Sequence, residues 1–424
     1  MGIRIVHLST YYTVGGAALA AFRLHAAMRR LGYDSTMLVR EPQHLDDDPV
    51  LSLQQNPSPG ARLLARLRTE WLSRRFARHL RSRSETMDCF SFDRSPYGRQ
   101  LVRQLPPADV INLHWVAEFL DYESFFTAVP KSVPVVWRLA DMNPFTGGCH
   151  FDCGCGKYAH GCGSCPQLLS RNPKDLSSAI WRRKQAVFRR VDPSRLHLVA
   201  LSRWMANTLA KSPLLSKFPV TIIPNGVDTD IFRPLNRAFA REALNLANDT
   251  KWILFLAHDT QTGRKGFAEL RAALRGLDDP TVSLLSVGPG NLKVDSGHPH
   301  LHLGPIVNPR SLPVVYSAAD LFVVPSLQDN FPNAVLESMA CGTPVVGFAT
   351  GGIPDMVRNG ATGITVPTGD ASALRLALAG LLKNPALRSE MSADCRRTAL
   401  AEYSRETQVR RYLDLYQRVI AGER

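Results

Sequence analysis

The chain has 424 residues, a formal net charge of +14 at pH 7 and 45% hydrophobic residues. Domains usually hold about 100–200 residues, so this length predicts two of them. No apolar run approaches the ~18 residues that a membrane-spanning helix needs. The opening residues 1–8 lack the charged start and the long apolar stretch of a secretion signal. These features predict a cytoplasmic globular protein.

The charge is unevenly placed along the chain. Residues 1–228 hold 30 lysines and arginines against 18 acidic residues, whereas residues 229–424 hold 21 against 19. A basic half beside a nearly neutral half indicates an anionic partner, and nucleic acid, anionic lipid and polyphosphate all satisfy this. No nucleic-acid motif and no basic patch interleaved with aromatic residues accompanies the charge. We therefore predict no nucleic-acid partner.

Strand-like and helix-like segments alternate along the first half. Residues 3–8 have the pattern of a buried strand, Gly15 and Gly16 follow after a short loop, and 17–31 carry apolar residues at helical spacing. Further strands are expected at 35–39, 109–114, 133–139, 196–201 and 220–223. Strands that alternate with helices predict an α/β fold with a parallel sheet and helices on both faces.

The alternation restarts after a junction at 224–234. Strands expected at 252–256, 282–287, 321–324 and 344–347 predict a second sheet, and a closing helix is expected at about 405–424. No sequence repeat relates the two halves, so one fold type is used twice. The predicted domains are residues 1–228, with the closing helix packed back on them, and residues 229–404.

Two segments at expected strand ends suit phosphate. Open parallel sheets bind ligands at the carboxyl ends of their strands, where loops lead into helix N-termini. Gly15 and Gly16 would let the backbone approach a diphosphate, although an ordinary tight turn explains the pair equally well. The segment 325–344 carries more information, because a strand ends at Pro325 and a helix begins near Asn333.

The amides of residues 333–335 are expected to point at an anion. Glu337 lies one turn further along the same helix face, where its carboxylate is suited to accept two sugar hydroxyls. For this pair in isolation, a helix-capping Asn333 with a solvated Glu337 is the alternative.

Four motifs occur in a fixed order. They are Pro224-Asn225-Gly226-Val227-Asp228, Arg264-Lys265-Gly266, the segment 325–344, and Gly351-Gly352-Ile353-Pro354-Asp355 followed by Gly360 and Gly363. This order resembles the retaining glycosyltransferases of family 4, from Gly15 to beyond Pro367. The segment 141–150 also resembles a bacterial surface-polysaccharide subgroup. The resemblance implies the GT-B fold, with two facing Rossmann-like domains and a cleft between them.

The resemblance also implies a role for each matching residue. Lys265 would bind the donor's phosphates, Glu337 would hold the ribose, and His114 would line the donor-sugar site. Outside its motif, His114 would be read as a satisfied histidine at a strand end. The implied catalytic residues are His114, Lys265, Asp329 and Glu337. The implied donor-binding residues are Gly15, Gly16, Arg264, Lys265, Asn330, Phe331, Pro332, Asn333, Ala334, Val335 and Glu337.

Three departures from the family pattern matter. Asp329 stands where Glu is usual, and it is followed by Asn rather than Gly. Asp259 and Thr260 stand where an Arg is usual, so Arg264 is expected to reach the phosphates instead. Ala140 stands where the subgroup has His before Asp. These departures support an alternative function, a nucleotide-sugar-binding scaffold without turnover.

The function implied by the resemblance is metal-independent, retaining transfer of a sugar. The donor is a nucleoside diphosphate sugar, and the acceptor is a hydroxyl of a glycan or lipid-linked glycan in bacterial polysaccharide biosynthesis. Lys, Arg and helix amides would stabilise the leaving diphosphate, so no catalytic metal is expected.

Five of the eight cysteines lie between 149 and 165. Four thiolates with one C-x-x-C pair suit a tetrahedral structural zinc. The expected ligands are Cys149, Cys155, Cys162 and Cys165, which leaves Cys153 spare. Reduced, unliganded cysteines and a disulfide pair are the alternatives.

Two basic stretches carry an apolar stripe at helical spacing. Residues 62–83 hold eight arginines, and residues 180–195 have a similar pattern. Basic amphipathic helices can lie on anionic membranes, which predicts a peripheral position on the inner face of the cell membrane. Alternatively, the apolar side packs on its own domain and the charges are solvated.

Overall fold

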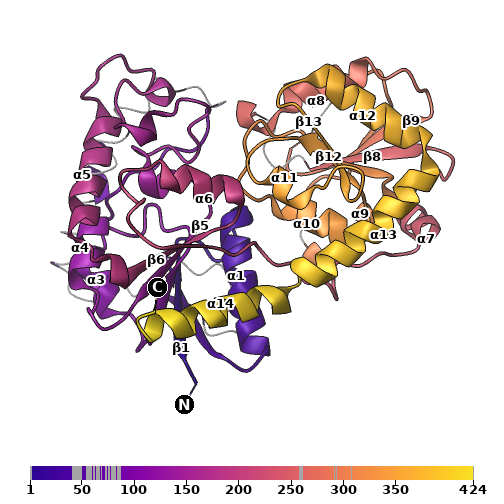
Figure 1. Cartoon of the computed structure of the whole chain (residues 1–424). Helices are drawn as coiled ribbons and strands as arrows, with labels where there is room; N and C mark the ends of the chain where they lie inside the picture. The colour runs from indigo at the N-terminus through magenta and orange to yellow at the C-terminus, as the bar shows by residue number, and fades with distance from the viewer. Residues whose placement is uncertain are drawn as a thin grey trace. The chain divides into compact units, whose positions relative to one another are not determined.

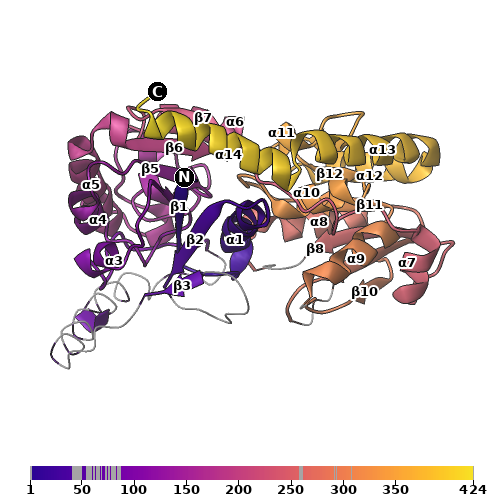
Figure 2. The ribbon, with the colours of Figure 1, turned by 90° about the horizontal axis from the view of Figure 1, so that it is seen from below.

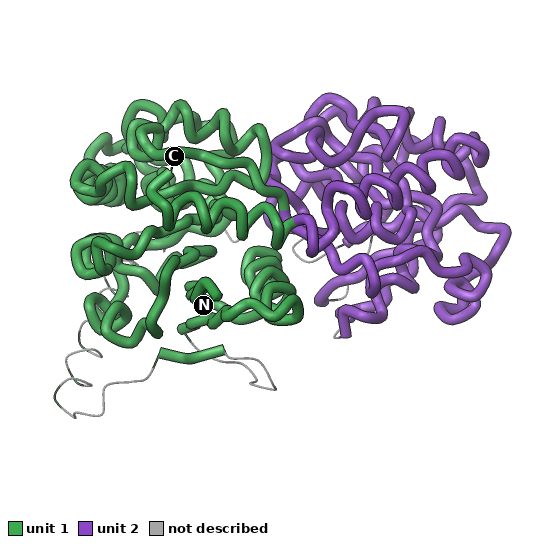
Figure 3. The backbone as a smooth tube through the Cα atoms, turned by 60° about the horizontal axis from the view of Figure 1, so that its bottom comes forward, with its two compact units in different colours: residues 1–224, 408–424 green, residues 225–407 purple. Residues whose placement is uncertain are grey.

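The computed structural model describes residues 2–423, except 41–49, 54–59, 257–260, 291, 293, 307 and most of 61–86, where it describes 63, 67, 69–71, 74, 77 and 83. The chain divides into two compact units (Figure 3). Unit 1 comprises residues 1–224 and 408–424, and unit 2 comprises residues 225–407.

Unit 1 is built on a parallel sheet, in which seven strands are described (Figure 1). In spatial order they are β3 (Val50–Ser52), β2 (Asp34–Val39), β1 (Arg4–Ser9), β4 (Val110–Leu113), β5 (Val135–Leu139), β6 (Leu196–Ala200) and β7 (Val220–Ile222). The four central strands, β1, β4, β5 and β6, are almost wholly buried, as strands with both faces covered must be. Because their sequences are nearly continuous apolar runs, these strands could be predicted from the sequence.

Helices cover both faces of this sheet. They are α1 (Gly15–Arg30), α3 (Arg99–Arg103), α4 (Tyr122–Ala128), α5 (Leu176–Arg190) and α6 (Arg203–Ala210), with 3-10 turns η1 (Asn143–Phe145), η2 (Lys157–Ala159), η3 (Pro166–Leu168) and η4 (Pro193–Arg195). Trp137 of β5 packs on one face with side chains of α4, α5 and α6. Its neighbour Val136 points to the opposite face, where α1 packs. This alternation is the period of two that a strand imposes.

The chain ends in α14 (Arg405–Ile420), which returns to unit 1 (Figure 2). Val409, Tyr412, Leu415 and Tyr416 are almost fully buried, in one cluster with α1 and the central strands. The spacing of these four side chains is that of one helix face.

Unit 2 has the second parallel sheet, with six described strands. Their order is β10 (His300–His302), β9 (Val282–Val287), β8 (Lys251–Leu256), β11 (Leu321–Val324), β12 (Val345–Phe348) and β13 (Gly363–Val366). The helices are α7 (Arg237–Ala243), α8 (Phe267–Arg275), α9 (Leu312–Ala318), α10 (Asn333–Ala340), α11 (Ile353–Met356), α12 (Ala371–Lys383) and α13 (Pro385–Glu402), with 3-10 turns η5 (Gly263–Lys265) and η6 (Pro309–Ser311). Leu270 of α8 and Leu378 of α12 are fully buried against β8, β9, β11 and β12.

The α/β fold with two parallel sheets is confirmed. Every strand expected from the sequence is present within a residue or two, whereas the three-residue strands β3 and β10 and the strand β13 were not expected. Among the described helices, none combines the length and the apolar character needed to cross a bilayer.

Candidate active site

The loop after β8 and the loop after β11 meet at the carboxyl edge of the unit 2 sheet. Lys265 Nζ donates to Asp329 Oδ2 at 2.7 Å, and Arg264 NH1 lies 3.8 Å from the same oxygen. Burial opposes the charge of Asp329, but the nearby lysine and arginine charges hold the pKa of its carboxyl below the usual value. Arg264 and Lys265 from one motif and Asp329 from another therefore form one ionic cluster.

Glycines line the contacts of the loop after β11: Gly266 lies where the loop after β8 meets it, and Gly351 lies where the loop after β12 meets it. Gly266 has φ +67, and a Cβ at this position would lie 1.7 Å from the carbonyl oxygen of Pro325. Gly351 has φ +55, and its Cβ would lie 1.7 Å from the carbonyl oxygen of Asp329. Only glycine has the left-handed φ at low cost and leaves room for the neighbouring backbone. The glycines of both motifs thus hold Asp329 beside the cations.

Helix α10 begins at Asn333, as the sequence predicted. Its N-cap is Pro332, and no side chain caps the helix, so Asn333 is not the capping residue. Instead, Asn333 Oδ1 accepts a hydrogen bond from Asn225 Nδ2 at 2.9 Å. Asn330 and Phe331 in the preceding loop are buried, so these side chains anchor the loop.

Glu337 is buried on α10. Its residue surface is 4% exposed, and its Oε2 accepts a hydrogen bond from the Tyr316 hydroxyl at 3.0 Å. The solvated Glu337 of the alternative interpretation is therefore wrong. Helical spacing could not reveal the hydrogen bond that Tyr316 of α9 donates to this carboxylate.

In unit 1, Gly15 and Gly16 form the first turn of α1, directly beyond the carboxyl end of β1. The sequence had placed them before the helix. Gly15 has φ +81, and no atom lies within 4 Å of the position that its Cβ would take. The helix N-terminus here has no side-chain cap, and its first two residues present only backbone.

His114 follows β4 and is only 2% exposed. Its Nε2 lies 2.9 Å from Nδ1 of His7, which is also buried. Burial lowers the pKa of both imidazoles well below the usual value, so both rings are neutral at pH 7. The sequence identified His114 but not His7, although both lie near the ends of neighbouring strands.

None of the eight cysteines, all of which are described, forms a disulfide. Burial raises the pKa of Cys149, that of Cys162 to about 12, and that of Cys165. The Gly147 amide donates to Cys162 Sγ at 3.2 Å. Within the described part of the chain, no three His, Cys, Asp or Glu side chains are arranged to hold a metal ion. The zinc ligand set stays a prediction.

Unit 1 contains a buried polar network that no sequence pattern indicated. His150 Nδ1 lies 2.5 Å from Asp141 Oδ2, and His150 Nε2 lies 2.9 Å from the Ser91 hydroxyl. Trp115 Nε1 donates to the same Asp141 oxygen at 2.8 Å, and its ring stacks on His150. Asp141 and His150 lie in the motif 141–150, but Ser91 is 59 positions from His150, so no local pattern links them.

The Asp141–His150 pair is charged despite its burial. Burial works against the charge on each group. However, the Asp141 carboxylate raises the pKa of His150 to about 10, and the His150 imidazolium keeps the pKa of Asp141 below its usual value. The imidazolium thus donates a hydrogen bond from each ring nitrogen at neutral pH.

The comparison with protein families concerns unit 2. Residues 250–384 match the family model described as "Glycosyl transferases group 1". The match lies within unit 2 and covers less than half of the chain. It contains Arg264, Lys265, Asp329 and Glu337, whereas Gly15, Gly16, His114 and the cysteine cluster lie outside the match.

Curated relatives match part of the chain. A D-inositol 3-phosphate glycosyltransferase of Mycolicibacterium paratuberculosis is 35% identical over 180 residues, which are 39% of this chain and 40% of that protein. The enzyme of the same name from Saccharomonospora viridis is 31% identical over 223 residues, 48% of this chain and 51% of that protein. The chain thus spans 40% and 51% of the length of these two relatives. They do not single out the surface-polysaccharide subgroup.

Solved structures share the fold along almost the whole chain. Sucrose-phosphate synthase from Thermosynechococcus elongatus has a TM-score of 0.69 at 21% identity, covering 99% of this chain and 100% of that one. HepE of Anabaena, solved with UDP and glucose, has a TM-score of 0.63 at 14% identity, covering 98% and 99%. These similarities, together with the two sheets, confirm the Rossmann-like units of a GT-B glycosyltransferase fold.

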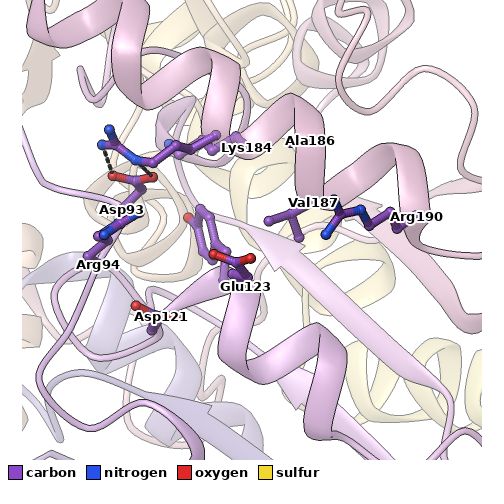
Figure 4. A pocket seen from close by; sticks show the side chains of 10 residues that line it. Asp93, Arg94, Asp121, Glu123, Lys184, Ala186, Val187 and Arg190 are labelled. Carbon is purple, nitrogen blue, oxygen red and sulfur yellow. Dashed lines mark hydrogen bonds and ion pairs between the residues drawn. The ribbon is translucent and has the colours of Figure 1, made fainter.

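A charged hollow of about 90 Å³ lies elsewhere on unit 1 (Figure 4). Its charged lining residues are Asp93, Arg94, Asp121, Glu123, Arg183, Lys184 and Arg190. Lys184 is fully buried, and its ammonium donates to the carbonyl oxygens of Asn143 and Thr146. Burial lowers the pKa of Lys184 to about 8. None of the predicted site residues lines this hollow, and Lys184 instead fastens the turn that precedes the cysteines.

The raised pKa of His150 makes a pH-dependent contribution to stability. The contribution is complete below pH 6.5, where the unfolded histidine is also protonated, and it is lost as pH rises through about 10. The difference in melting temperature between wild type and His150→Gln should therefore shrink steadily from pH 6 to pH 10. The underlying free-energy change is at most about 1.4 kcal/mol per pH unit. Calorimetry of both proteins measures it, and a constant difference would contradict the charged pair.

Proposed function

We propose that the protein is a retaining glycosyltransferase that takes its sugar from a nucleoside diphosphate sugar. The acceptor is a hydroxyl of a glycan or lipid-linked glycan, and the setting is bacterial polysaccharide biosynthesis. The observation that carries the proposal is the cationic cluster of Arg264 and Lys265 at the carboxyl edge of the unit 2 sheet, within the residues that match the glycosyl transferases group 1 model.

The comparisons support a nucleotide-sugar donor. The curated relatives are named glycosyltransferases, and HepE was solved with UDP and with UDP-glucose. A diphosphate beside Lys265, Arg264 and the first amides of α10 would find two cations and a helix N-terminus, which together favour an anion. In this proposal, the loop and helix from Asn330 to Val335 hold the donor.

The cations would act most strongly when the bond to the leaving diphosphate breaks. Negative charge then grows on the phosphate oxygens, and fixed cations stabilise it without reorganisation. Without a donor, Lys265 forms an ion pair with Asp329. The donor's phosphates must therefore share this lysine with a buried carboxylate. We infer that Asp329 keeps Lys265 in position and that its carboxylate contacts the donor sugar's hydroxyls.

The remaining roles follow from the same proposal. Glu337 would hold the ribose hydroxyls after exchanging its hydrogen bond with Tyr316. His114 would line the donor sugar, Gly15 and Gly16 would face the diphosphate or acceptor, and no metal would take part. A scaffold that binds the nucleotide sugar without turnover is the second candidate, supported by Asp329 and Ala140 standing at altered motif positions. Release of UDP from UDP-glucose decides between the two.

The donor site can be tested with UDP alone. Lys265→Ala removes a charge-assisted hydrogen bond to the phosphates, so UDP should bind roughly 10- to 100-fold more weakly. Titration calorimetry measures the affinity. The titration is done well below the melting temperature of the variant, because Asp329 loses its closest cation and the variant is expected to be less stable. Lys251→Ala is the matched control, since Lys251 pairs with Asp279 at 2.8 Å and lies at the opposite end of β8. Equal affinities of wild type and Lys265→Ala would refute the assignment.

We also propose a structural zinc on Cys149, Cys155, Cys162 and Cys165. A metal binds the deprotonated sulfur, so its binding at this cluster would release the cysteine protons. Elemental analysis of protein purified without chelators should give one zinc per chain. Cys162→Ser should lose this metal, whereas Cys153→Ser should retain it. Finding no zinc in the wild-type protein would refute the proposed site.

Finally, we propose that the enzyme works in the cytoplasm at the inner face of the cell membrane. Leu63 and Leu67, in the arginine-rich stretch, are 59% and 58% exposed. The expected apolar residues of 180–195 behave differently, because Ile180, Trp181 and Phe188 are buried in unit 1. This second stretch therefore follows the alternative of packing on its own domain.

Membrane docking predicts binding to vesicles that contain phosphatidylglycerol at low salt and release at high salt. Replacing Arg74, Arg75, Arg78 and Arg81 by Gln should reduce cosedimentation; the last three lie outside the described residues. Replacing the exposed Arg189 and Arg190 of α5 is the control and should have no effect. Equal binding to neutral phosphatidylcholine vesicles would argue against electrostatic docking.

A further inference from the structure

The turn after β4 holds a charged residue in an unfavourable backbone conformation. Glu118 has φ 64, in the left-handed region that glycine favours. The turn is fixed on both sides, since the Thr10 hydroxyl donates to the Ala117 carbonyl at 2.7 Å and Phe119 is fully buried. The chain must therefore reverse at residue 118, and a glycine would do so at lower cost.

The contacts of the Glu118 side chain do not offset this cost. Arg40 NH1 lies 3.6 Å from Glu118 Oε2, and the side chain of Glu118 is 42% exposed. A long ion pair at a half-exposed position contributes little to stability, less than a left-handed glutamate costs. Strained residues that stability does not explain are concentrated at functional sites. The strain alone does not define a role, since the exposed Leu169 also has a left-handed φ, but at residue 118 it holds a carboxylate that can bind a ligand.

A chain of buried polar side chains lies behind Glu118. His150 Nε2 lies 2.9 Å from the Ser91 oxygen. The Ser91 hydroxyl in turn donates to Glu118 Oε1 at 3.4 Å. Ser91 is 1% exposed and does not reach solvent itself. These side chains thus lead from Asp141 to a carboxylate with its remaining lone pairs open to solvent.

The surroundings favour a ligand that is recognised by hydroxyl groups. Tyr11 and Trp115 lie beside each other at the same sheet edge, but their ring faces are taken. Arg40 covers Tyr11 with its guanidinium 5.1 Å from the ring centroid, and His150 stacks on Trp115. A sugar ring cannot stack on these residues. Carboxylate oxygens, by contrast, accept hydrogen bonds from neighbouring hydroxyls.

We propose that the Glu118 carboxylate, held at the carboxyl end of β4 by Ser91 and Arg40, binds hydroxyl groups of the sugar acceptor. This inference rests on the proposed glycosyltransferase function, and it assigns Glu118 as a residue that selects the acceptor. Asp141, His150 and Ser91 are positioning residues, which act through Glu118.

Glycine substitution separates binding from stability. Glu118→Gly removes the carboxylate and relieves the left-handed strain, so the melting temperature should stay equal or rise while acceptor binding is lost. Leu169→Gly is the matched control, because Leu169 also has a left-handed φ of 50 and is 58% exposed in unit 1. It should give a similar or higher melting temperature with binding retained.

The binding probes are methyl α-glucoside, methyl α-mannoside, methyl β-galactoside and myo-inositol. They are observed by saturation-transfer NMR in the presence of UDP. At least one should bind wild type and Leu169→Gly, and its signal should fall at least fivefold with Glu118→Gly. A signal that survives in Glu118→Gly overturns the proposal, and so does the absence of binding to wild type. A fall in melting temperature with Glu118→Gly but not with Leu169→Gly also overturns it, because the carboxylate would then be structural.

UDP binding to the same samples tests the donor site separately. Wild type and both glycine variants should bind UDP with the same affinity, because neither substitution touches unit 2. A wild-type protein that binds UDP but fails the glycoside test overturns only the role of Glu118. A wild-type protein that does not bind UDP overturns the proposed function itself.

Discussion

The ion pair between Lys265 and the buried carboxylate of Asp329 is the contact on which the unit 2 site depends. Asp329 is only 9% exposed. A buried carboxylate destabilises the folded protein unless an opposite charge compensates it, so removing one partner of such a pair is strongly destabilising. This requirement forces the loop after β8 against the loop after β11. The backbone agrees with it, since the Leu327 amide donates to the Arg264 carbonyl at 2.7 Å.

Unit 1 uses the same principle at its own sheet edge. Asp141 and His150 are both buried, and each keeps the other charged. Because the two charges satisfy one another, the outward effect of the pair is directional: it fixes the Trp115 indole and the Ser91 hydroxyl. Buried ion pairs add little to net stability, but they specify orientation, and orientation is what a binding site needs.

The fold could be predicted well from the sequence because it depends on local patterns. Buried parallel strands are continuous apolar runs, so the central strands were all found. The strand β10 (His300–His302) is short and half-buried, and nothing in its composition separates it from a loop. Gly266 and Gly351 were noticed as motif residues, but that each faces a carbonyl oxygen less than 2 Å from an added Cβ needs the structure.

The site could be predicted only where one segment carries it. Arg264 and Lys265 are adjacent, so their motif was visible. The burial of Glu337 could not be predicted, because its hydrogen-bond partner Tyr316 lies on another helix, α9. The His7–His114 pair joins residues 107 positions apart. Contacts of this kind leave no local periodicity, so they are invisible to any reading of spacing alone.

The two basic amphipathic stretches show where such a pattern stops being informative. In α5, Phe188 joins Trp137 and Phe126 in the core, and even Lys184 is buried because carbonyl oxygens satisfy its ammonium. At Leu63 and Leu67 the same apolar spacing leaves the side chains exposed. Apolar side chains contribute about 25 cal/mol per Å² only when something covers them. The covering surface comes from distant parts of the chain or from another molecule. The pattern therefore indicates which side chains favour burial, but not which surface buries them.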